Sequence, residues 1–483
     1  MTNTLEHKAP SMLDALIPLI ALIFMLSGAV YYFGDNSTGG PNQIALLIAT
    51  GIAIIIGIKN NYTWKELEQA MINGISISMG AIFILLAVGS LIGTWMLSGT
   101  VPSMIYYGLK ILDPSWFYPA TCIICCIVAL SIGSSWTTAA TIGVALMGIS
   151  VGLGLDPAIT AGAIISGAYC GDKISPLSET TNLAPVVAGS ELFAHIRYMM
   201  WTTIPSIVLS LLIFTFLGFS VESTVTLEAV ADITRQLDTN FNINPLNLVP
   251  VALLLFMAMK KVPAFPAVAI GALFGAVWSI IFQPELINNL ATNGLDTLKA
   301  NITVVWGALF DGVTINSGDA DLDSLLSGGG MKSMLNIVWL IMCALMFGAI
   351  LEHLGMLKKF VQAILGSVKS VGGLIASTVG TCIGTNLVTA DQYISIVMPG
   401  RMYKEEYKRR NLDPLVLSRT LEDSGTLSSP LIPWNTCGAF MFGVLALTNY
   451  EYIFYCFFNF ISPILAIAYG FTGYKIKKLV TTS

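Results

Sequence analysis

The stretch that decides the fold lies between two long apolar runs and reads Gly171-Asp172-Lys173-Ile174-Ser175-Pro176-Leu177-Ser178-Glu179-Thr180-Thr181-Asn182-Leu183-Ala184-Pro185. It contains two carboxylates, one ammonium group and two prolines, and proline kinks or breaks a continuous helix. Within a bilayer, irregular backbone survives only where protein or a water-filled cavity satisfies its polar groups. We therefore interpret this stretch as a break in a membrane helix that binds an ion or a small substrate.

The composition of the whole chain is that of a membrane protein. Of its 483 residues, 55% are hydrophobic and 11% are charged, whereas soluble domains carry about 25% charged residues. Apolar runs recur from residue 16 to residue 471, and many are long enough to cross a bilayer of about 30 Å. We predict an all-α polytopic membrane protein with about ten full spans, in which residues 15–33 form a retained first span rather than a signal peptide.

Lysine and arginine in short loops predict the orientation, because they are enriched on the cytoplasmic side of membrane proteins. The basic loops fall on one side of the predicted topology, around Lys59 and Lys65, at Lys260 and Lys261, and within residues 401–410. Both termini are therefore predicted to be cytoplasmic. The eight cysteines and three histidines show no spacing typical of a disulfide framework or a transition-metal site, and no cofactor is expected.

Two parts of the chain repeat one another. Residues 132–139 resemble residues 383–390, and a Ser-Pro-Leu sequence occurs at both 175–177 and 429–431. The predicted orientation of the first copy is opposite to that of the second. Inverted repeats with broken helices in matching places are typical of secondary transporters, whose binding site lies near the middle of the membrane.

The spacing within the two copies is the same. Gly133 precedes Asp172 by 39 positions, and Gly384 precedes Asp423 by the same number (172 − 133 and 423 − 384). A chance match of short Gly, Ser and Thr strings would not be expected to conserve both this spacing and the opposite orientation.

The repeats divide the chain into N-terminal spans (1–70), a first repeat (71–219), linker spans with an extracytoplasmic segment (220–333), a second repeat (334–472) and a cytoplasmic tail (473–483). Each repeat is predicted to hold a re-entrant hairpin and a discontinuous helix, at about 116–155 and 157–197 in the first copy and at about 374–399 and 415–447 in the second. The second hairpin is expected to break at residues 380–386. The first is equally compatible with two full spans.

Polar side chains beside the two breaks form the predicted site. An ionised aspartate at the centre of a bilayer costs about 3 kcal/mol on insertion scales, so buried acids need partners. Oxygen ligands suit a hard cation such as sodium. The predicted ligands of sodium or a proton are Asp172, Asp391, Asp423, Ser135, Thr138, Ser175, Thr181, Asn182, Asn386, Thr389 and Asn435, and the predicted charge partners are Lys173, Arg419, Glu179 and Glu422.

A buried carboxylate is able to serve two ions in turn. Burial favours its protonated form and a nearby cation favours its ionised form, so sodium and a proton compete for the same oxygen atoms. Exchange follows if the loaded carrier can carry its site from one side of the membrane to the other and the empty carrier cannot. We expect Asp172 to be the primary exchange group, with Asp391 or Asp423 second. For Glu422 and Asp423, pairing with Arg419 is an alternative to ion binding.

These residues resemble the NhaC-type sodium/proton antiporter family, which also contains sodium-linked malate/lactate antiporters. The resemblance rests on residues 133–148, 166–185 and 421–436, with Cys170 and Glu179 standing where the family pattern has an aromatic residue and an aspartate. It implies a carrier in the inner membrane of a bacterium. Kinship with a wider superfamily of ion transporters implies a mobile domain that moves against a scaffold within a homodimer.

Other functions fit parts of the sequence. Exchange of an organic anion such as malate or lactate with sodium or protons is a close alternative, because Lys173, Arg419 or a helix N-terminus would hold its carboxylate. A channel would need a continuous polar stripe, whereas the acids here cluster at two breaks. An intramembrane enzyme lacks a catalytic Ser–His or metal-binding histidine spacing, and no nucleic-acid partner is indicated. We therefore predict a secondary active transporter that exchanges sodium for protons by alternating access.

Overall fold

The computed structural model describes residues 7–220, 227–291, 295–315, 323 and 326–479. Within this part of the chain nine helices are long and apolar enough to cross a membrane. The number rises to ten if the pair Val230–Asn240 and Pro245–Met259, which is bent by 90°, is counted as one span. The described residues form two isolated bridges and no strands. The prediction of an all-α polytopic membrane protein with about ten spans is confirmed.

The helices follow the apolar runs of the sequence. Their bounds in chain order are α1 Met12–Phe33, α2 Pro41–Lys59, α3 Trp64–Ile77, α4 Met79–Leu97, α5 Thr100–Ile111, α6 Phe117–Ile132, α7 Ser135–Thr138, α8 Val144–Gly152, α9 Pro157–Ile174, α10 Glu179–Ala188, α11 Leu192–Phe219, α12 Leu227–Asn240, α13 Val249–Met259, α14 Ala264–Phe282, α15 Pro284–Leu290, α16 Thr297–Phe310, α18 Leu335–His353, α19 Met356–Ser367, α20 Val371–Thr389, α21 Gln392–Arg409, α22 Pro414–Leu421, α23 Thr436–Val444 and α24 Phe457–Thr472. Two π-helical turns, Ala139–Gly143 and Glu422–Thr426, continue α7 and α22.

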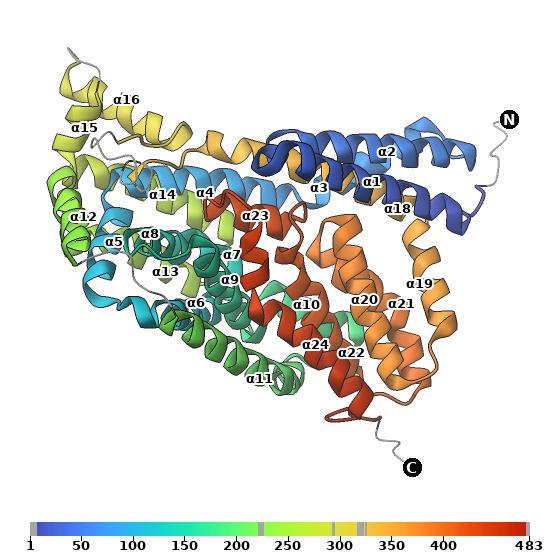
Figure 1. Cartoon of the computed structure of the whole chain (residues 1–483). Helices are drawn as coiled ribbons and strands as arrows, with labels where there is room; N and C mark the ends of the chain where they lie inside the picture. The colour runs from blue at the N-terminus through green and yellow to red at the C-terminus, as the bar shows by residue number, and fades with distance from the viewer. Residues whose placement is uncertain (1–6, 221–226, 292–294, 316–322, 324–325, 480–483) are drawn as a thin grey trace.

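The helices form two layers (Figure 1). One layer contains α1, α2, α3 and α18, which pack against one another, together with α4, α14 and α16. The other contains the broken segments of both repeats, in which α6 packs on α9, α20 packs on α21 and α24, and α11 packs on α24. The hairpins and broken helices predicted from the sequence therefore lie together in one layer. The helices α4 and α18, which precede them in the chain, lie in the other.

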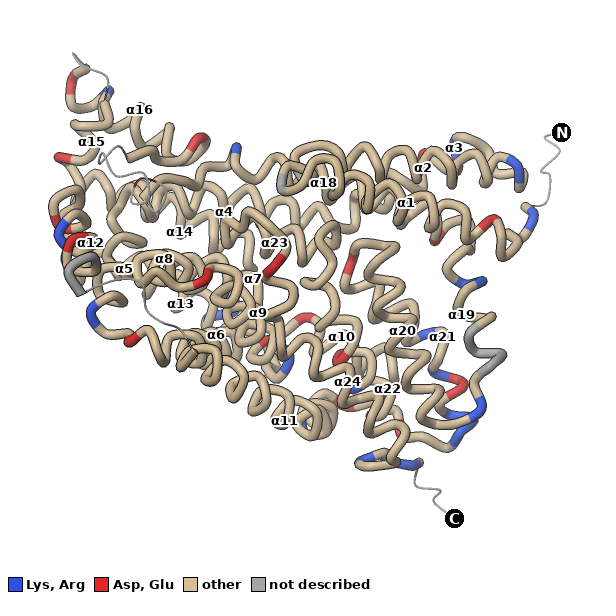
Figure 2. Tube along the Cα trace, in the orientation of Figure 1, with Lys and Arg blue, Asp and Glu red and all other residues tan. Residues whose placement is uncertain are grey.

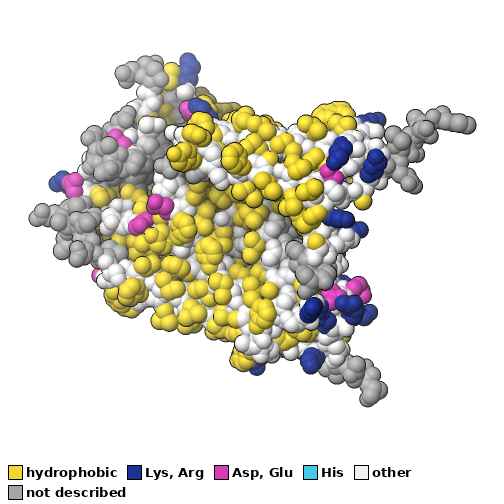
Figure 3. All heavy atoms as spheres, turned by 45° about the vertical axis from the view of Figure 1, so that its right-hand side comes forward, with side chains coloured by type: hydrophobic (Ala, Val, Ile, Leu, Met, Phe, Trp, Pro, Cys, Tyr) yellow, Lys and Arg dark blue, Asp and Glu magenta, His cyan; other side chains and the backbone are white. Residues whose placement is uncertain are grey.

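The surface of the molecule has the pattern of a membrane protein. Apolar side chains cover a broad face between the two ends (Figure 3). Lysines and arginines gather at the end where α1 begins and α24 ends (Figure 2). Several acids lie inside the layer that contains the broken segments, which is the lower one in this view. The gathering of basic residues at one end agrees with the asymmetry that the loop charges predict.

The predicted break in the first repeat lies between α9 and α10, at residues 175–178. Pro176 cannot donate a backbone hydrogen bond, and the side chain of Asn182 compensates for the interruption by donating to the carbonyls of Pro176 (2.9 Å) and Ser178 (2.6 Å). Ser178 then caps α10 by accepting from the backbone of Thr181 (3.4 Å). The second proline, Pro185, lies inside α10 and does not end it.

The predicted break at residues 380–386 in the second repeat is wrong, because α20 runs through this segment without interruption. Its glycines permit a break but do not force one. The chain turns instead at Ala390, which has a φ of 55°, and Asp391. The carbonyl of Ala390 accepts from the backbone of Thr436 (2.8 Å). The turn is therefore held by contacts with a distant helix, which the local sequence does not reveal.

Helices α6 and α9 pack closely because α9 presents glycines to α6. A Cβ atom on Gly167 would lie 2.1 Å from the carbonyl oxygen of Cys122, and one on Gly171 would lie 2.1 Å from that of Cys126. We expect Gly167→Ala to lower the free energy of unfolding by about 1–3 kcal/mol, because the backbones must separate. Thermal unfolding of the purified protein in detergent measures the effect.

Gly380 on α20 provides the matched control, because a Cβ atom there would meet nothing within 4 Å. Gly380→Ala should leave the melting temperature unchanged or raise it, since alanine favours a helix over glycine by about 1 kcal/mol. Equal melting temperatures for the two variants would contradict the close contact between α6 and α9.

Candidate functional site

Asp172 lies at the end of α9, where the break of that helix meets the first hairpin. Its Oδ2 accepts hydrogen bonds from the backbone N–H (3.1 Å) and the hydroxyl (2.8 Å) of Ser135, the first residue of α7. The hairpin can approach because Gly133 has a φ of 76°, and a Cβ atom there would lie 2.5 Å from Cβ of Leu177. Asp172 is 7% exposed, and its Oδ1 has no hydrogen-bond partner among the described residues.

Glu422 is a second buried carboxylate that lacks a full set of partners. It begins the π-helical turn after α22, and its Oε1 accepts from the hydroxyls of Thr180 (2.9 Å) and Thr426 (2.9 Å). Its Oε2 has no hydrogen-bond partner in the described part of the chain. The hydroxyl of Thr180 lies 3.2 Å from that of Ser178 at the α9–α10 break. A short row of hydroxyls thus connects this break to Glu422.

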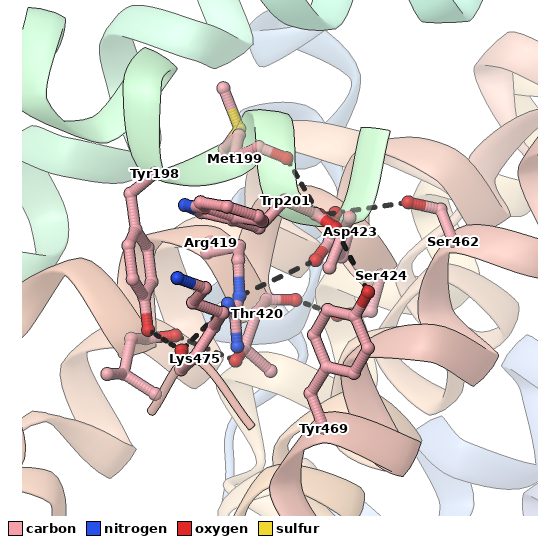
Figure 4. Close-up of polar contacts among 12 residues, drawn as sticks. Tyr198, Met199, Trp201, Arg419, Thr420, Asp423, Ser424, Ser462, Tyr469 and Lys475 are labelled. Carbon is pink, nitrogen blue, oxygen red and sulfur yellow. Dashed lines mark hydrogen bonds and ion pairs between the residues drawn. The ribbon is translucent and has the colours of Figure 1, made fainter. Parts of the chain in front are cut away.

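Asp423, by contrast, lies within ion-pair distance of two basic side chains, although its Oδ2 accepts no hydrogen bond from the described residues. Its Oδ1 accepts from Nζ of Lys173 and from the hydroxyls of Thr202 (3.0 Å) and Ser462 (3.1 Å). Nε of Arg419 lies 4.0 Å from its Oδ2. The side chains of Lys173, Arg419 and Asp423 are all fully buried, and Figure 4 shows Arg419 and Ser462 on either side of Asp423.

The buried charges of the two broken helices do not balance. Three carboxylates, of Asp172, Glu422 and Asp423, face two basic side chains, of Lys173 and Arg419. With every group ionised, and with the buried His195 neutral, the cluster carries one net negative charge. An uncompensated buried charge is strongly unfavourable. One monovalent cation would make the cluster neutral, and unpartnered oxygen atoms of Asp172 and Glu422 are available to bind it.

Two of the predicted acidic residues have other contacts. Asp391 caps α21 by accepting from the backbone of Tyr393 (2.9 Å) and Ile394 (3.0 Å), and its other oxygen accepts from the hydroxyl of Ser78 (3.1 Å). Glu179 is exposed and accepts from the hydroxyl of Tyr393. Neither acid contacts the buried cluster through any described hydrogen bond or ion pair.

Of the three predicted amides, Asn182 lies at the α9–α10 break, whereas Asn386 and Asn435 lie beside the interruption between α22 and α23. Nδ2 of Asn435 donates to Oδ1 of Asn386 (3.0 Å), and Nδ2 of Asn386 donates to the carbonyl of Gly425 (2.6 Å) and the hydroxyl of Ser428 (2.9 Å). Asn386 and Asn435 therefore tie α20 and the start of α23 to the π-helical turn that carries Glu422 and Asp423.

The predicted hydroxyls donate mainly to backbone carbonyls. Thr138 and Thr389 each donate to the carbonyl four residues earlier (2.9 Å each), as is common for these residues in helices. Ser175 donates to Leu130 (2.8 Å) and Thr181 to Lys173 (2.9 Å). Their oxygen lone pairs remain able to bind a cation, but only Ser135 contacts a carboxylate of the cluster directly.

The sequence analysis missed several members of the cluster. They are hydroxyl residues that donate to its acids: Thr180, Thr202, Thr426 and Ser462. Thr202 and Ser462 lie in runs that otherwise look like ordinary apolar spans. The available signal on α11 was the spacing of Thr202, Ser206 and Ser210, which puts three buried hydroxyls on one face of the helix.

A cavity of about 850 Å³ lies elsewhere in the fold, lined by residues of α4, α5, α8, α18 and α23. None of the five charged residues of the cluster lines it. Trp136, next to Ser135, stacks on Phe440 with ring centroids 4.0 Å apart, and the neighbours Ala439 and Phe442 line the cavity. The cavity and the buried cluster are therefore separate sites in the structure.

Buried acids and bases at two broken helices, within a multi-pass helical membrane protein, define a secondary transporter. A family model described as the Na⁺/H⁺ antiporter family matches residues 11–181 and 167–474, and the chain belongs to this family.

Characterised relatives cover nearly the whole chain. It is 39% identical over 436 residues to the Na(+)/H(+) antiporter NhaC of Alkalihalophilus pseudofirmus. The aligned residues cover 90% of this chain and 91% of that protein. It is 36% identical over 470 residues to the Malate-2H(+)/Na(+)-lactate antiporter of Bacillus subtilis, covering 97% and 96% of the two chains. It is also 36% identical to the Arginine/ornithine antiporter ArcD of Halobacterium salinarum, covering 97% and 94%.

Proposed function

We propose that this protein exchanges sodium for protons across the cytoplasmic membrane, with the two ions competing for buried carboxylates. The observation that carries the proposal is the burial of three carboxylates beside only two basic side chains, a formal excess of one negative charge, together with the unpartnered oxygen atoms of Asp172 and Glu422. A proton or a sodium ion supplies the one positive charge that the cluster lacks. Membership of the Na⁺/H⁺ antiporter family supports the same activity.

The charge balance explains why the carrier does not let sodium or protons pass without exchange. The loaded cluster is neutral, so its movement through a region of low dielectric carries little electrostatic penalty, whereas the empty cluster keeps an uncompensated charge. The carrier therefore changes its accessibility with one ion or the other bound. We assign Asp172 and Glu422 to ion exchange, and Asp423 to holding Lys173 and Arg419 in place.

The orientation and assembly of the protein are part of the proposal. Basic residues gather at the end where α1 begins and α24 ends (Figure 2), so we place that end, with both termini, in the cytoplasm of a bacterium. The layer that holds the broken helices would be the mobile domain and the other layer the scaffold, as the family resemblance implies. The predicted homodimer would form through the scaffold.

Exchange of an organic anion is the second candidate. It is favoured by the Malate-2H(+)/Na(+)-lactate antiporter among the relatives and by Arg419, whose buried Nη2 has no hydrogen-bond partner in the described part of the chain. Arginine binds carboxylates well through its planar guanidinium group. Under this reading, Arg419 and Lys173 would contact the carboxylate of the anion.

Transport into proteoliposomes with a trapped pH-sensitive dye tests both candidates. Sodium, lithium, potassium and malate are added in turn, and sodium is expected to drive proton movement without malate. We expect the apparent sodium affinity to weaken as the pH falls, by up to about tenfold per pH unit, because protons occupy the same oxygen atoms. A sodium affinity that stays constant between about pH 6 and pH 9 would contradict a shared site, and sodium-driven uptake of labelled malate would favour the second candidate.

A further inference from the structure

The end of the chain folds back over the layer that carries the buried cluster. After α24, Gly473 and Lys475 adopt left-handed backbone conformations, with φ of 72° and 50°. Residues 473–479, which we call the C-terminal strap, then run alongside the connector that precedes α22. The backbone of Asp413 donates to the carbonyl of Lys477 (3.0 Å), and that of Leu479 donates to the carbonyl of Asn411 (3.0 Å).

Side chains add to the attachment of the strap. Nζ of Lys477 lies 3.1 Å from Oδ2 of Asp413, and Nζ of Lys475 lies 3.8 Å from the ring centroid of Trp201. A cation held over a tryptophan ring is attracted by the negative face of the ring. The strap is therefore attached to both α11 and the start of α22.

The strap also contacts the buried cluster through one backbone carbonyl (Figure 4). The carbonyl of Lys475 accepts from Nη1 of Arg419 (3.2 Å) and from the hydroxyl of Tyr198. The guanidinium of Arg419 lies between the rings of Tyr198, at 4.5 Å, and Tyr469, at 5.9 Å. It makes no other hydrogen bond in the described structure, since its Nε and Nη2 have no such partner.

Arg419 thus has an acceptor from the strap on one side and Asp423 on the other. Its Nε lies 4.0 Å from Oδ2 of Asp423, and Glu422 is three residues further along the same helical segment. Without the strap, its long side chain is free to extend toward the cytoplasmic surface, as buried arginines near helix ends do. That movement would take one positive charge away from the three acids.

We propose that the C-terminal strap is a positioning element for ion exchange: the Lys475 carbonyl fixes Arg419 beside Asp423 and thereby sets the sodium affinity of the neighbouring carboxylates. This inference rests on the proposed sodium/proton exchange. With Arg419 displaced, the cluster is more negative, so sodium binds more tightly and leaves more slowly.

The test compares two shortened chains in proteoliposomes. A chain that ends at Gly473 lacks the Lys475 carbonyl, whereas a chain that ends at Leu479 keeps every strap contact described above. We expect the first to show an apparent KM for sodium at least about threefold lower than that of the full chain, with a lower maximal rate. The second should match the full chain in both quantities.

Tyr198→Phe provides an independent variant if the shorter chain does not insert into the membrane. It keeps the ring against Arg419 and removes only the hydroxyl that donates to Lys475. It should shift the KM for sodium in the same direction by a smaller factor. A strap with a purely structural role would lower the amount of folded protein and leave KM unchanged, and that result would overturn the proposal. Absence of exchange by the full chain would instead overturn the proposed function.

Discussion

Replacing Asp172 by asparagine is expected to abolish sodium/proton exchange. Asparagine has nearly the same shape, and its Oδ1 still accepts the hydrogen bonds that Ser135 donates to Asp172. It cannot bind a proton or carry a negative charge. The cluster of two acids and two bases that remains is neutral without a cation, so the force that draws sodium into it is removed.

The expected size of this effect follows from the cost of charge within a membrane. An uncompensated charge at the bilayer centre costs about 3 kcal/mol on insertion scales. Loss of this driving force corresponds to a change of about a hundredfold in the affinity for sodium. The measurement is the initial rate of sodium-driven proton movement in proteoliposomes that contain equal amounts of each variant. Asp172→Glu keeps the carboxylate and should retain part of the activity, with an altered sodium affinity.

Asp156 supplies the matched control on the same helix. It lies at the N-terminus of α9, is exposed, and caps the helix by accepting from the backbone of Ala158 (2.7 Å). Asparagine caps a helix about as well as aspartate, so Asp156→Asn should exchange at the rate of the unchanged protein. If Asp172→Asn also does so, Asp172 is not an exchange group and the assignment of the site fails.

The sequence allowed the spans and the first break to be predicted because their causes are local. Long apolar runs form membrane helices, and Pro176 interrupts one of them. The break at Ala390 and Asp391 had no such signal, since it depends on the backbone of Thr436 and on Ser78, which are distant in the chain. The glycines at 380 and 384 suggested a break that the helix does not make.

The acids of the site were predictable, but their pairing was not. An acid within a membrane segment stands out in any sequence, and the four-residue spacing of Arg419 and Asp423 indicated a contact between them. The partner of Lys173 is also Asp423, which is 250 positions away. Only the folded arrangement shows that Asp423 is neutralised by two bases while Asp172 and Glu422 are not, and this difference decides which acids are assigned to ion binding.

Replacing Lys173 by methionine is expected to destabilise the protein by about 3–5 kcal/mol, because breaking a buried ion pair leaves a charge without its partner. Methionine fills a similar volume. Lys173 and Asp423 are both fully buried, and the hydroxyl of Ser462 contacts both of them. Thermal unfolding in detergent, followed with a thiol-reactive dye, measures the loss, because seven of the eight free cysteines are buried and become reactive on unfolding.

Lys332→Met is the control, since it breaks an ion pair of similar geometry at the surface. Nζ of Lys332 lies 2.7 Å from Oδ1 of Asp311, but the two side chains are 69% and 52% exposed. Exposed pairs contribute about 0–1 kcal/mol, so this variant should unfold close to the temperature of the unchanged protein. If Lys173→Met unfolds at that same temperature, Asp423 carries no charge that needs Lys173. The count of one net negative charge, on which the choice of a monovalent cation depends, would then be wrong.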